Sequence, residues 1–140
     1  MKFKIVLAFC MAASYLSSDE YQFLGKHFIA SYSGCDATAL KDVNRLEEVM
    51  LEAVAQTGAT TLSSIKHVFH PDGLTMVVLL GESHASIHTY PEHGSCFVDL
   101  FTCGDHCHSE NFDQHLRNYL HPAIVNHKVM IRHENIEDDE

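Results

Sequence analysis

The residues between Glu82 and Cys103 include most of the side-chain types that proteins use for nucleophilic attack and proton transfer. Ser83 comes shortly after the apolar run 76–80, and His88 and the Cys103 thiol follow it. Hydroxyl, thiol, imidazole and carboxylate groups act as nucleophiles or as general acids and bases. This segment is therefore the candidate active site, although its spacing alone does not identify the reaction.

The residue types leave two generic kinds of catalytic site open. A Ser-His-Asp hydrolase would use Ser83, His88 and Asp99, but the GxSxG pattern of the nucleophile elbow is missing around the serine. A cysteine hydrolase would instead pair Cys103 with a histidine.

The composition narrows the class of protein. A chain of 140 residues fits one domain whose core is large enough to fold alone. The formal net charge of −10 argues against a protein that binds nucleic acid, and it is compatible with a small cationic substrate. The five cysteines are odd in number and irregularly spaced, which indicates a reducing compartment, so we expect a cytoplasmic protein.

A cluster of metal-ligand residue types also occurs in the sequence. Cys103, His106, Cys107 and His108 are close enough in sequence to form a zinc site. The paired CxxC motifs of a structural zinc site are missing, and we therefore expect no metal.

The two ends of the chain differ in character from its middle. Residues 1–18 have the outline of a secretory signal peptide, with Lys2 and Lys4 ahead of the apolar run 5–13. That run is too short to span a bilayer, and the free thiols downstream favour an uncleaved first strand or an N-terminal extension, so we expect no membrane association. Residues 135–140 form an acidic tail, which we expect to be disordered.

The apolar periodicity predicts the elements that position the candidate site. A helix is expected over 37–56, with Asp36 as its cap and Gly58 at its end. A second helix carries Phe112, Leu116 and Leu120. The predicted strands are 28–32, 62–69, 74–80, 85–90, 96–101 and 125–132.

These elements predict the fold class. The continuous apolar strand 74–80 is expected to be central or buried on both faces. Consecutive antiparallel strands with two helices on one face make an α+β two-layer sandwich, with residues 19–134 forming one domain.

Two sequence blocks resemble those of a known family. The block from Glu82 to Glu92, ESHxSIHTYPE, and the later block VDLFTCG at 98–104 closely resemble the self-cleaving, pyruvoyl-dependent S-adenosylmethionine decarboxylases of the short prokaryotic type. The resemblance runs from about Gly25 to Gly104 and covers most of the chain.

The resemblance implies that the chain makes its own cofactor. It would cut itself between Glu82 and Ser83 into a β chain, 1–82, and an α chain, 83–140. The serine hydroxyl attacks the preceding carbonyl, and β-elimination and hydrolysis then leave a pyruvoyl group. That ketone forms a Schiff base with the substrate and takes the place of pyridoxal phosphate.

The resemblance also implies roles for individual residues. Cys103 would return a proton to the substrate carbon, and His88 would take the α-proton of Ser83 during elimination. Thr75 stands where a serine usually assists the acyl shift. His84, Ser86, Cys96 and Cys107 receive no role.

Three further residues match positions that hold the substrate in this family. Glu92 would bind the ribose hydroxyls, and Phe69 and Phe23 would sandwich the adenine near the sulfonium charge. Taken alone, each phenylalanine would more commonly be a core residue.

Short members of this family resemble one half of a larger, duplicated enzyme, which implies a homodimer with interface active sites. Ser83 and Cys103 would come from one protomer, and Thr75, His88 and Glu92 from the other. The expected reaction is decarboxylation of S-adenosylmethionine to the aminopropyl donor for spermidine synthesis. A pyruvoyl-dependent ornithine or arginine decarboxylase and a non-catalytic partner subunit are the alternatives.

Overall fold

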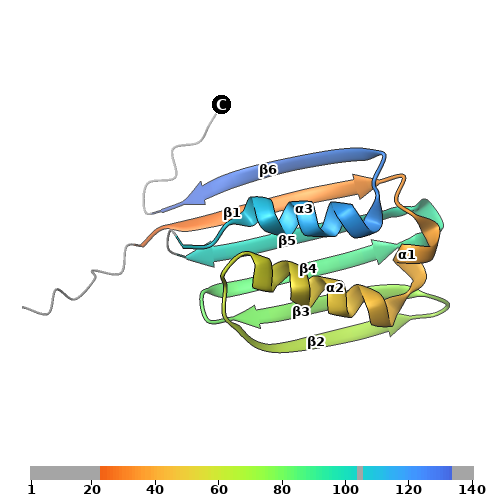
Figure 1. Ribbon diagram of the computed structural model, residues 1–140, viewed down its shortest axis with the longest axis horizontal. Helices are drawn as coiled ribbons and strands as arrows, with labels where there is room; N and C mark the ends of the chain where they lie inside the picture. Colours follow the sequence, from red (N-terminus) through yellow and green to blue (C-terminus); the bar gives the residue numbers. More distant parts are fainter. Residues whose placement is uncertain (1–22, 104–105, 134–140) are drawn as a thin grey trace, which may run out of the picture.

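A single antiparallel sheet forms the framework of the protein. The computed structural model describes residues 23–103 and 106–133. Six strands are arranged in the order β2-β3-β4-β5-β1-β6, and the helices lie together across one face (Figure 1). This arrangement confirms the predicted α+β two-layer sandwich. The strands are β1 Gly25–Ser33, β2 Thr61–Phe69, β3 Gly73–Leu80, β4 Ser83–Tyr90, β5 Ser95–Cys103 and β6 Ile124–Arg132.

The predicted helix 37–56 is wrong in one respect, because it is two helices. They are α1, Ala37–Lys41, and α2, Val43–Gln56, with the non-helical Asp42 between them. The Asp42 carboxylate accepts a hydrogen bond of 3.0 Å from the Arg45 backbone N–H. Aspartate favours such a capping position because its short side chain satisfies a free N–H of the first turn.

The outer boundaries of this helical pair agree with the sequence prediction. Asp36 caps α1 by accepting from the Ala39 backbone N–H at 2.8 Å. Gly58 follows α2 with φ at +87°, in the left-handed region that glycine occupies without steric cost. The third helix, α3 Ser109–Leu120, lies beside α2 and ends before Pro122, as predicted (Figure 1).

The strand 74–80 was predicted to be central or buried on both faces; β3 is an interior strand between β2 and β4, but its burial on both faces is wrong. Along β3, Leu74, Met76 and Val78 are buried, whereas Leu79 is 50% exposed. The cause is the two-layer architecture, since the helices cover only one face of the sheet. Side chains of alternate residues therefore pack on the helices or lie on the uncovered face, which we call the open face.

The core lies between the helices and the covered face of the sheet. Phe28 of β1 and Phe112 of α3 meet edge to face, with ring centroids 6.1 Å apart. Near them, the buried Tyr32 hydroxyl donates to Asp113, whose other oxygen accepts from Arg117. Burial and this carboxylate raise the pKa of Tyr32. These contacts hold the helices against the sheet on which the candidate site lies.

The predictions for the two ends fall outside the described residues. These are the extension 1–18 and the acidic tail 135–140. Within 23–103 and 106–133, no helix is long and apolar enough to cross a membrane.

Candidate functional site

One group of predicted site residues lies where β4 begins and β5 ends. Ser83 is the first residue of β4 and pairs with Thr102 of β5. Cys103 is the last residue of β5, and its backbone N–H donates to the Glu82 carbonyl oxygen at 3.2 Å. The structure therefore brings Glu82, Ser83 and Cys103 together, and it places a hydrogen-bond donor on the carbonyl that precedes the serine.

The Glu82 side chain has hydrogen-bonding partners of its own. Its carboxylate accepts from the Thr60 backbone N–H at 2.9 Å and lies 3.2 Å from the Thr60 hydroxyl. His106 Nε2 is 3.4 Å from the same carboxylate. The Thr60 N–H and these neighbours hold the pKa of Glu82 below its usual range. The residue before Ser83 is thus fixed through both its side chain and its backbone.

A second group of predicted residues lies at the opposite end of β4. His88 pairs with Thr75 of β3 in the sheet register, and its Nδ1 lies 3.1 Å from the Thr75 hydroxyl oxygen. Both residues line a hollow of about 650 Å³ together with Phe69 and Glu92. The remaining lining residues are Lys41, His70, Pro71, Asp72, Gly73, Thr89, Tyr90 and Pro91. Four predicted site residues therefore share one pocket.

The two groups are too far apart to form one site within a single chain. Ser83 and His88 are five positions apart on one strand, which corresponds to about 17 Å at roughly 3.4 Å per residue. This separation excludes the generic triad of Ser83, His88 and Asp99 within a protomer. The predicted site residues therefore form two separate groups, one at each end of β4, which we call the half-sites.

The two predicted substrate-binding phenylalanines lie outside the core. Phe23 is 75% exposed and precedes β1, whose first residue, Gly25, pairs with Cys103. Phe69 is 52% exposed at the end of β2, with its ring 4.6 Å from the ring of His67. Phe23 therefore belongs to the Ser83 end of the molecule, and Phe69 belongs to the His88 end.

A polar cluster that the sequence analysis did not predict lies on the open face beside Ser83. Asp99 of β5 has one carboxylate oxygen 3.1 Å from His27 Nε2 and 3.4 Å from His84 Nε2. Its other oxygen accepts from the Ser86 hydroxyl. The other ring nitrogen of His84, Nδ1, lies 3.2 Å from Ser83 Oγ. The alternation of side chains along a strand puts residues 84, 86 and 88 on one face, and this was the available signal.

The zinc cluster that the sequence raised as an alternative is not assembled. Within residues 23–103 and 106–133, the metal-ligand residues that come together are His27, His84 and Asp99, with ligand atoms within 4.8 Å of one another. Cys103, His106, Cys107 and His108 form no such group among the described residues.

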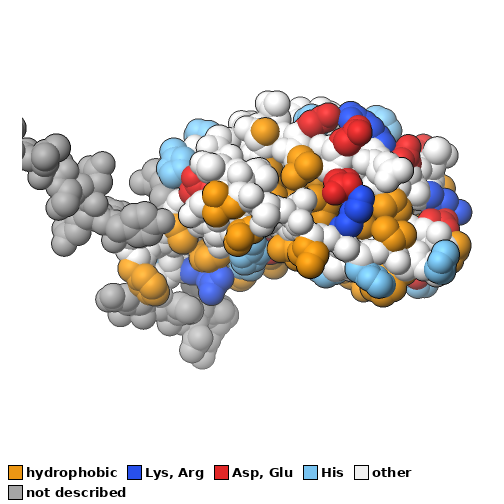
Figure 2. All heavy atoms as spheres, turned by 90° about the horizontal axis from the view of Figure 1, so that it is seen from below, with side chains coloured by type: hydrophobic (Ala, Val, Ile, Leu, Met, Phe, Trp, Pro, Cys, Tyr) orange, Lys and Arg blue, Asp and Glu red, His pale blue; other side chains and the backbone are white. Residues whose placement is uncertain are grey.

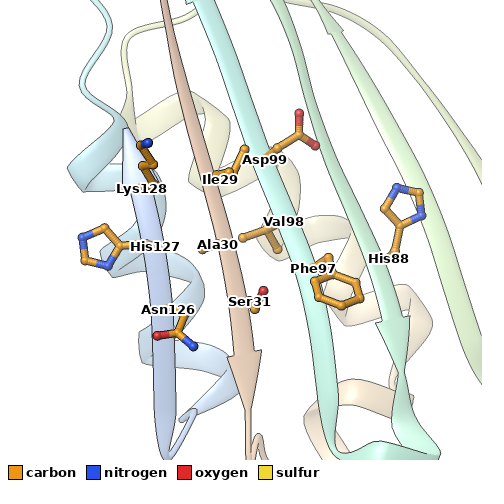
Figure 3. Close-up of a pocket in the computed structure, with 10 residues that line it drawn as sticks. All are labelled: Ile29, Ala30, Ser31, His88, Phe97, Val98, Asp99, Asn126, His127 and Lys128. Carbon is orange, nitrogen blue, oxygen red and sulfur yellow. The ribbon is translucent and has the colours of Figure 1, made fainter. Parts of the chain in front are cut away.

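The open face carries a shallow hollow of about 460 Å³ across β4, β5, β1 and β6 (Figure 3). One side of this hollow is formed by His88 of β4 and by Phe97 and Asp99 of β5 (Figure 3). The other side is formed by Asn126 and Lys128 of β6 (Figure 3). His88 lines both this hollow and the pocket with Glu92. The two hollows therefore adjoin at this histidine.

Large apolar side chains are exposed on the open face. Seen from the side on which β2 lies, hydrophobic side chains gather along the lower half and most acidic side chains lie above them (Figure 2). By strand alternation, the exposed residues on this face include Ile29, Ile65, Leu79, Tyr90 and Phe97. Exposed apolar patches of this kind are typical of interaction surfaces.

Comparisons with known proteins agree on one family. Residues 26–133 match the family model described as S-adenosylmethionine decarboxylase. The chain is 44% identical over 102 residues to the S-adenosylmethionine decarboxylase proenzyme of Methanococcus vannielii, covering 73% of this chain and 84% of that protein. It is 47% identical over 106 residues to the proenzyme of the same name from Synechococcus sp. strain WH7803, covering 76% and 81% of the two chains.

A solved structure shares the fold. The crystal structure of the adenosylmethionine decarboxylase from Aquifex aeolicus superposes with a TM-score of 0.71 at 36% sequence identity. The match covers 85% of this chain and 97% of that one.

Proposed function

The chain belongs to the S-adenosylmethionine decarboxylase family, and from this premise we propose that it is a self-processing decarboxylase of S-adenosylmethionine. The product would be the decarboxylated nucleoside that donates aminopropyl groups in spermidine synthesis. The observation that carries the proposal is the junction of Glu82 and Ser83. In this chain, Ser83 is the first residue of β4, and the Glu82 carbonyl oxygen accepts a hydrogen bond of 3.2 Å from the Cys103 backbone N–H.

The first stage is cleavage between Glu82 and Ser83. The Ser83 hydroxyl attacks the Glu82 carbonyl, and the peptide bond is exchanged for an ester. Negative charge develops on the carbonyl oxygen in this step, where a preorganised N–H donor lowers the barrier. The Cys103 backbone N–H has the direction and distance for this role. Elimination and hydrolysis then convert Ser83 into a pyruvoyl group at the start of the chain 83–140.

The mature site would combine that group with residues already described. The pyruvoyl group supplies the electron sink for loss of carbon dioxide, as a bound cofactor does in other decarboxylases. The Cys103 thiol, next to it in the sheet, would return a proton to the substrate carbon. Phe23 and Phe69 are exposed and free to contact adenine, and Glu92 lines the pocket where ribose hydroxyls would bind.

The active enzyme would be a homodimer of cleaved protomers. The residues proposed for one site lie in two half-sites about 17 Å apart, so a second chain must complete each site. Ser83 and Cys103 would face Thr75, His88 and Glu92 of the other protomer. The apolar open face supports the same arrangement, because it carries both the polar cluster beside Ser83 and the hollow at His88, and no element within residues 23–103 and 106–133 covers it.

The release of carbon dioxide from each candidate substrate tests the proposed function. We expect release from carboxyl-labelled S-adenosylmethionine and none above background from ornithine or arginine. The reason is that Glu92 and two exposed phenylalanines suit an adenosyl group, which the amino acids lack. Release from ornithine or arginine alone would identify the alternative pyruvoyl-dependent decarboxylase, and no release from any of them, with an uncut chain, would indicate a non-catalytic subunit.

Cys103→Ala should separate processing from turnover. The variant keeps the backbone N–H at the Glu82 carbonyl, so we expect the chain to be cut. Removal of the proton donor should slow decarboxylation by about 100-fold. Mass spectrometry measures the cut, and carbon dioxide release measures turnover.

Cys107→Ala is the matched control, since it removes a nearby buried thiol without an assigned role. Normal turnover in Cys103→Ala would show that another group donates the proton.

A further inference from the structure

Resting on the proposed self-cleavage, we propose that His84 is the base that takes the Ser83 hydroxyl proton in the acyl shift, with Asp99 as its positioning residue. The resemblance to the family assigns no role to either residue. The inference starts from two contacts of the His84 ring: a hydrogen bond between its Nδ1 and Ser83 Oγ, and an ion-pair contact between its Nε2 and the Asp99 carboxylate on the open face.

The carboxylate determines which nitrogen of His84 carries the hydrogen. A carboxylate accepts hydrogen bonds, so in the proposed step the hydrogen of the neutral His84 ring is on Nε2, which lies 3.4 Å from Asp99. In the neutral ring, Nδ1 is then the acceptor. This nitrogen lies 3.2 Å from Ser83 Oγ, within reach of the proton that the hydroxyl must lose.

Asp99 is itself held by partners on both of its oxygens. His27 Nε2 lies 3.1 Å from the oxygen that faces His84, and the Ser86 hydroxyl donates to the other. The carboxylate comes from β5, the neighbour of β4 in the sheet, and its strand position faces that of Ser86. The arrangement performs the orienting role of the aspartate in a Ser-His-Asp triad, with the two ring nitrogens exchanged.

The remaining requirement is a donor for the oxyanion, which the Cys103 backbone N–H provides at 3.2 Å from the Glu82 carbonyl oxygen. In the proposed step, Ser83 Oγ forms a bond to the carbonyl carbon of Glu82 while its proton passes to His84 Nδ1. The bond from that carbon to the Ser83 nitrogen then breaks, and His84 returns the proton to the nitrogen. The result is an ester and a free amine, with atoms and charge conserved.

In this assignment, His84 and His88 act in different steps of the processing reaction. His84 is next to Ser83 in the same chain and would act in the acyl shift. His88, about 17 Å along the strand, would act from the other protomer in the later elimination. Without His84, processing should therefore stop before the acyl shift, with the Glu82–Ser83 peptide bond intact. Without His88, processing should stop after the acyl shift, with Glu82 and Ser83 joined by an ester.

Hydroxylamine distinguishes these two stalled forms, because it cleaves an ester and leaves an amide intact. The proteins are made by cell-free translation with a short labelling pulse, and the appearance of fragments 1–82 and 83–140 is followed over time. Quenched, denatured samples are then treated with hydroxylamine. We expect His84→Ala to be cut about 100-fold more slowly than the natural chain, and its uncut form to resist hydroxylamine. Uncut His88→Ala should be cleaved by hydroxylamine.

Two further variants control for structural damage. His115→Ala removes a histidine that contacts Glu52 on the helical side, and it should be cut at the natural rate. Asp99→Asn is nearly isosteric and should slow cutting about 10-fold or more. Adding Asp99→Asn to His84→Ala should cause no further slowing, because the two residues act as one unit, whereas a purely structural effect would add.

The proposal is overturned if folded His84→Ala is cut at the natural rate, or if its uncut form is as labile to hydroxylamine as that of His88→Ala. If His84→Ala does not fold, Asp99→Asn decides, and natural-rate cutting of that variant overturns the proposal. Slower cutting of the natural chain in EDTA, restored by zinc, would make the cluster a metal site and also overturn it. A natural chain that never cuts would instead refute the proposed function.

Discussion

We expect Ser83→Ala to yield one uncut chain that releases no carbon dioxide from S-adenosylmethionine. The substitution removes the only atom that can attack the Glu82 carbonyl in the proposed reaction, and with it the source of the pyruvoyl group. The loss should be complete, because no other residue can supply the same ketone. The methyl side chain of alanine fits the half-buried start of β4, so the variant should fold.

Intact mass under denaturing conditions measures this outcome directly. The natural protein should give two fragments, 1–82 and 83–140, and the second should react through its N-terminal carbonyl with hydrazine reagents. Ser64→Ala, at an exposed position of β2, is the matched control and should be cut normally. Cleavage of Ser83→Ala, or a natural chain that stays whole with its serine intact, would contradict the proposed processing.

Two inactive variants should restore processing when they are expressed together. Ser83→Ala retains His88, and His88→Ala retains Ser83, so a mixed dimer contains one complete site if the residues come from different protomers. Neither variant should be cut when expressed alone. In equal mixture, about half of the His88→Ala chains should be cut, since half of them pair with the other variant at random.

Different affinity tags on the two chains allow their masses to be followed separately. The cut must occur in the His88→Ala chain, because only that chain carries Ser83. Co-expression with the double variant Ser83→Ala/His88→Ala is the matched control and should give no cutting, since no protomer then supplies the histidine. Absence of cutting in the first mixture would mean that the site is completed within one chain.

The sequence predicted the fold class because its apolar spacing and its caps are local signals. Asp36 and Gly58 mark ends of the helical region, and both do so through backbone hydrogen bonding or φ of the residue itself. The break at Asp42 has the same local cause, but the apolar period continued through it and concealed it. The exposure of Leu79 was not predictable from a continuous apolar run, because it depends on which face the helices cover.

The candidate site shows the same division between local and long-range information. The blocks around Ser83 and Cys103 identified a segment, yet only the strand register reveals that His88 lies far from Ser83 and beside Thr75. The link between His84 and Asp99 joins two strands, so neither block contains it alone. Contacts between distant parts of the chain are set by the sheet as a whole, which the sequence does not display.

The strand order determines what happens to the two pieces after the cut. β1 belongs to the piece 1–82, but it lies between β5 and β6, which both belong to the piece 83–140. β3 of the first piece is likewise paired with β4 of the second. Strands of the two pieces are therefore interleaved in one sheet, and the pieces cannot dissociate without disrupting its hydrogen bonds. Once denatured, however, they must find each other by diffusion, and recovery of the mature protein should depend on concentration, unlike that of the uncut precursor.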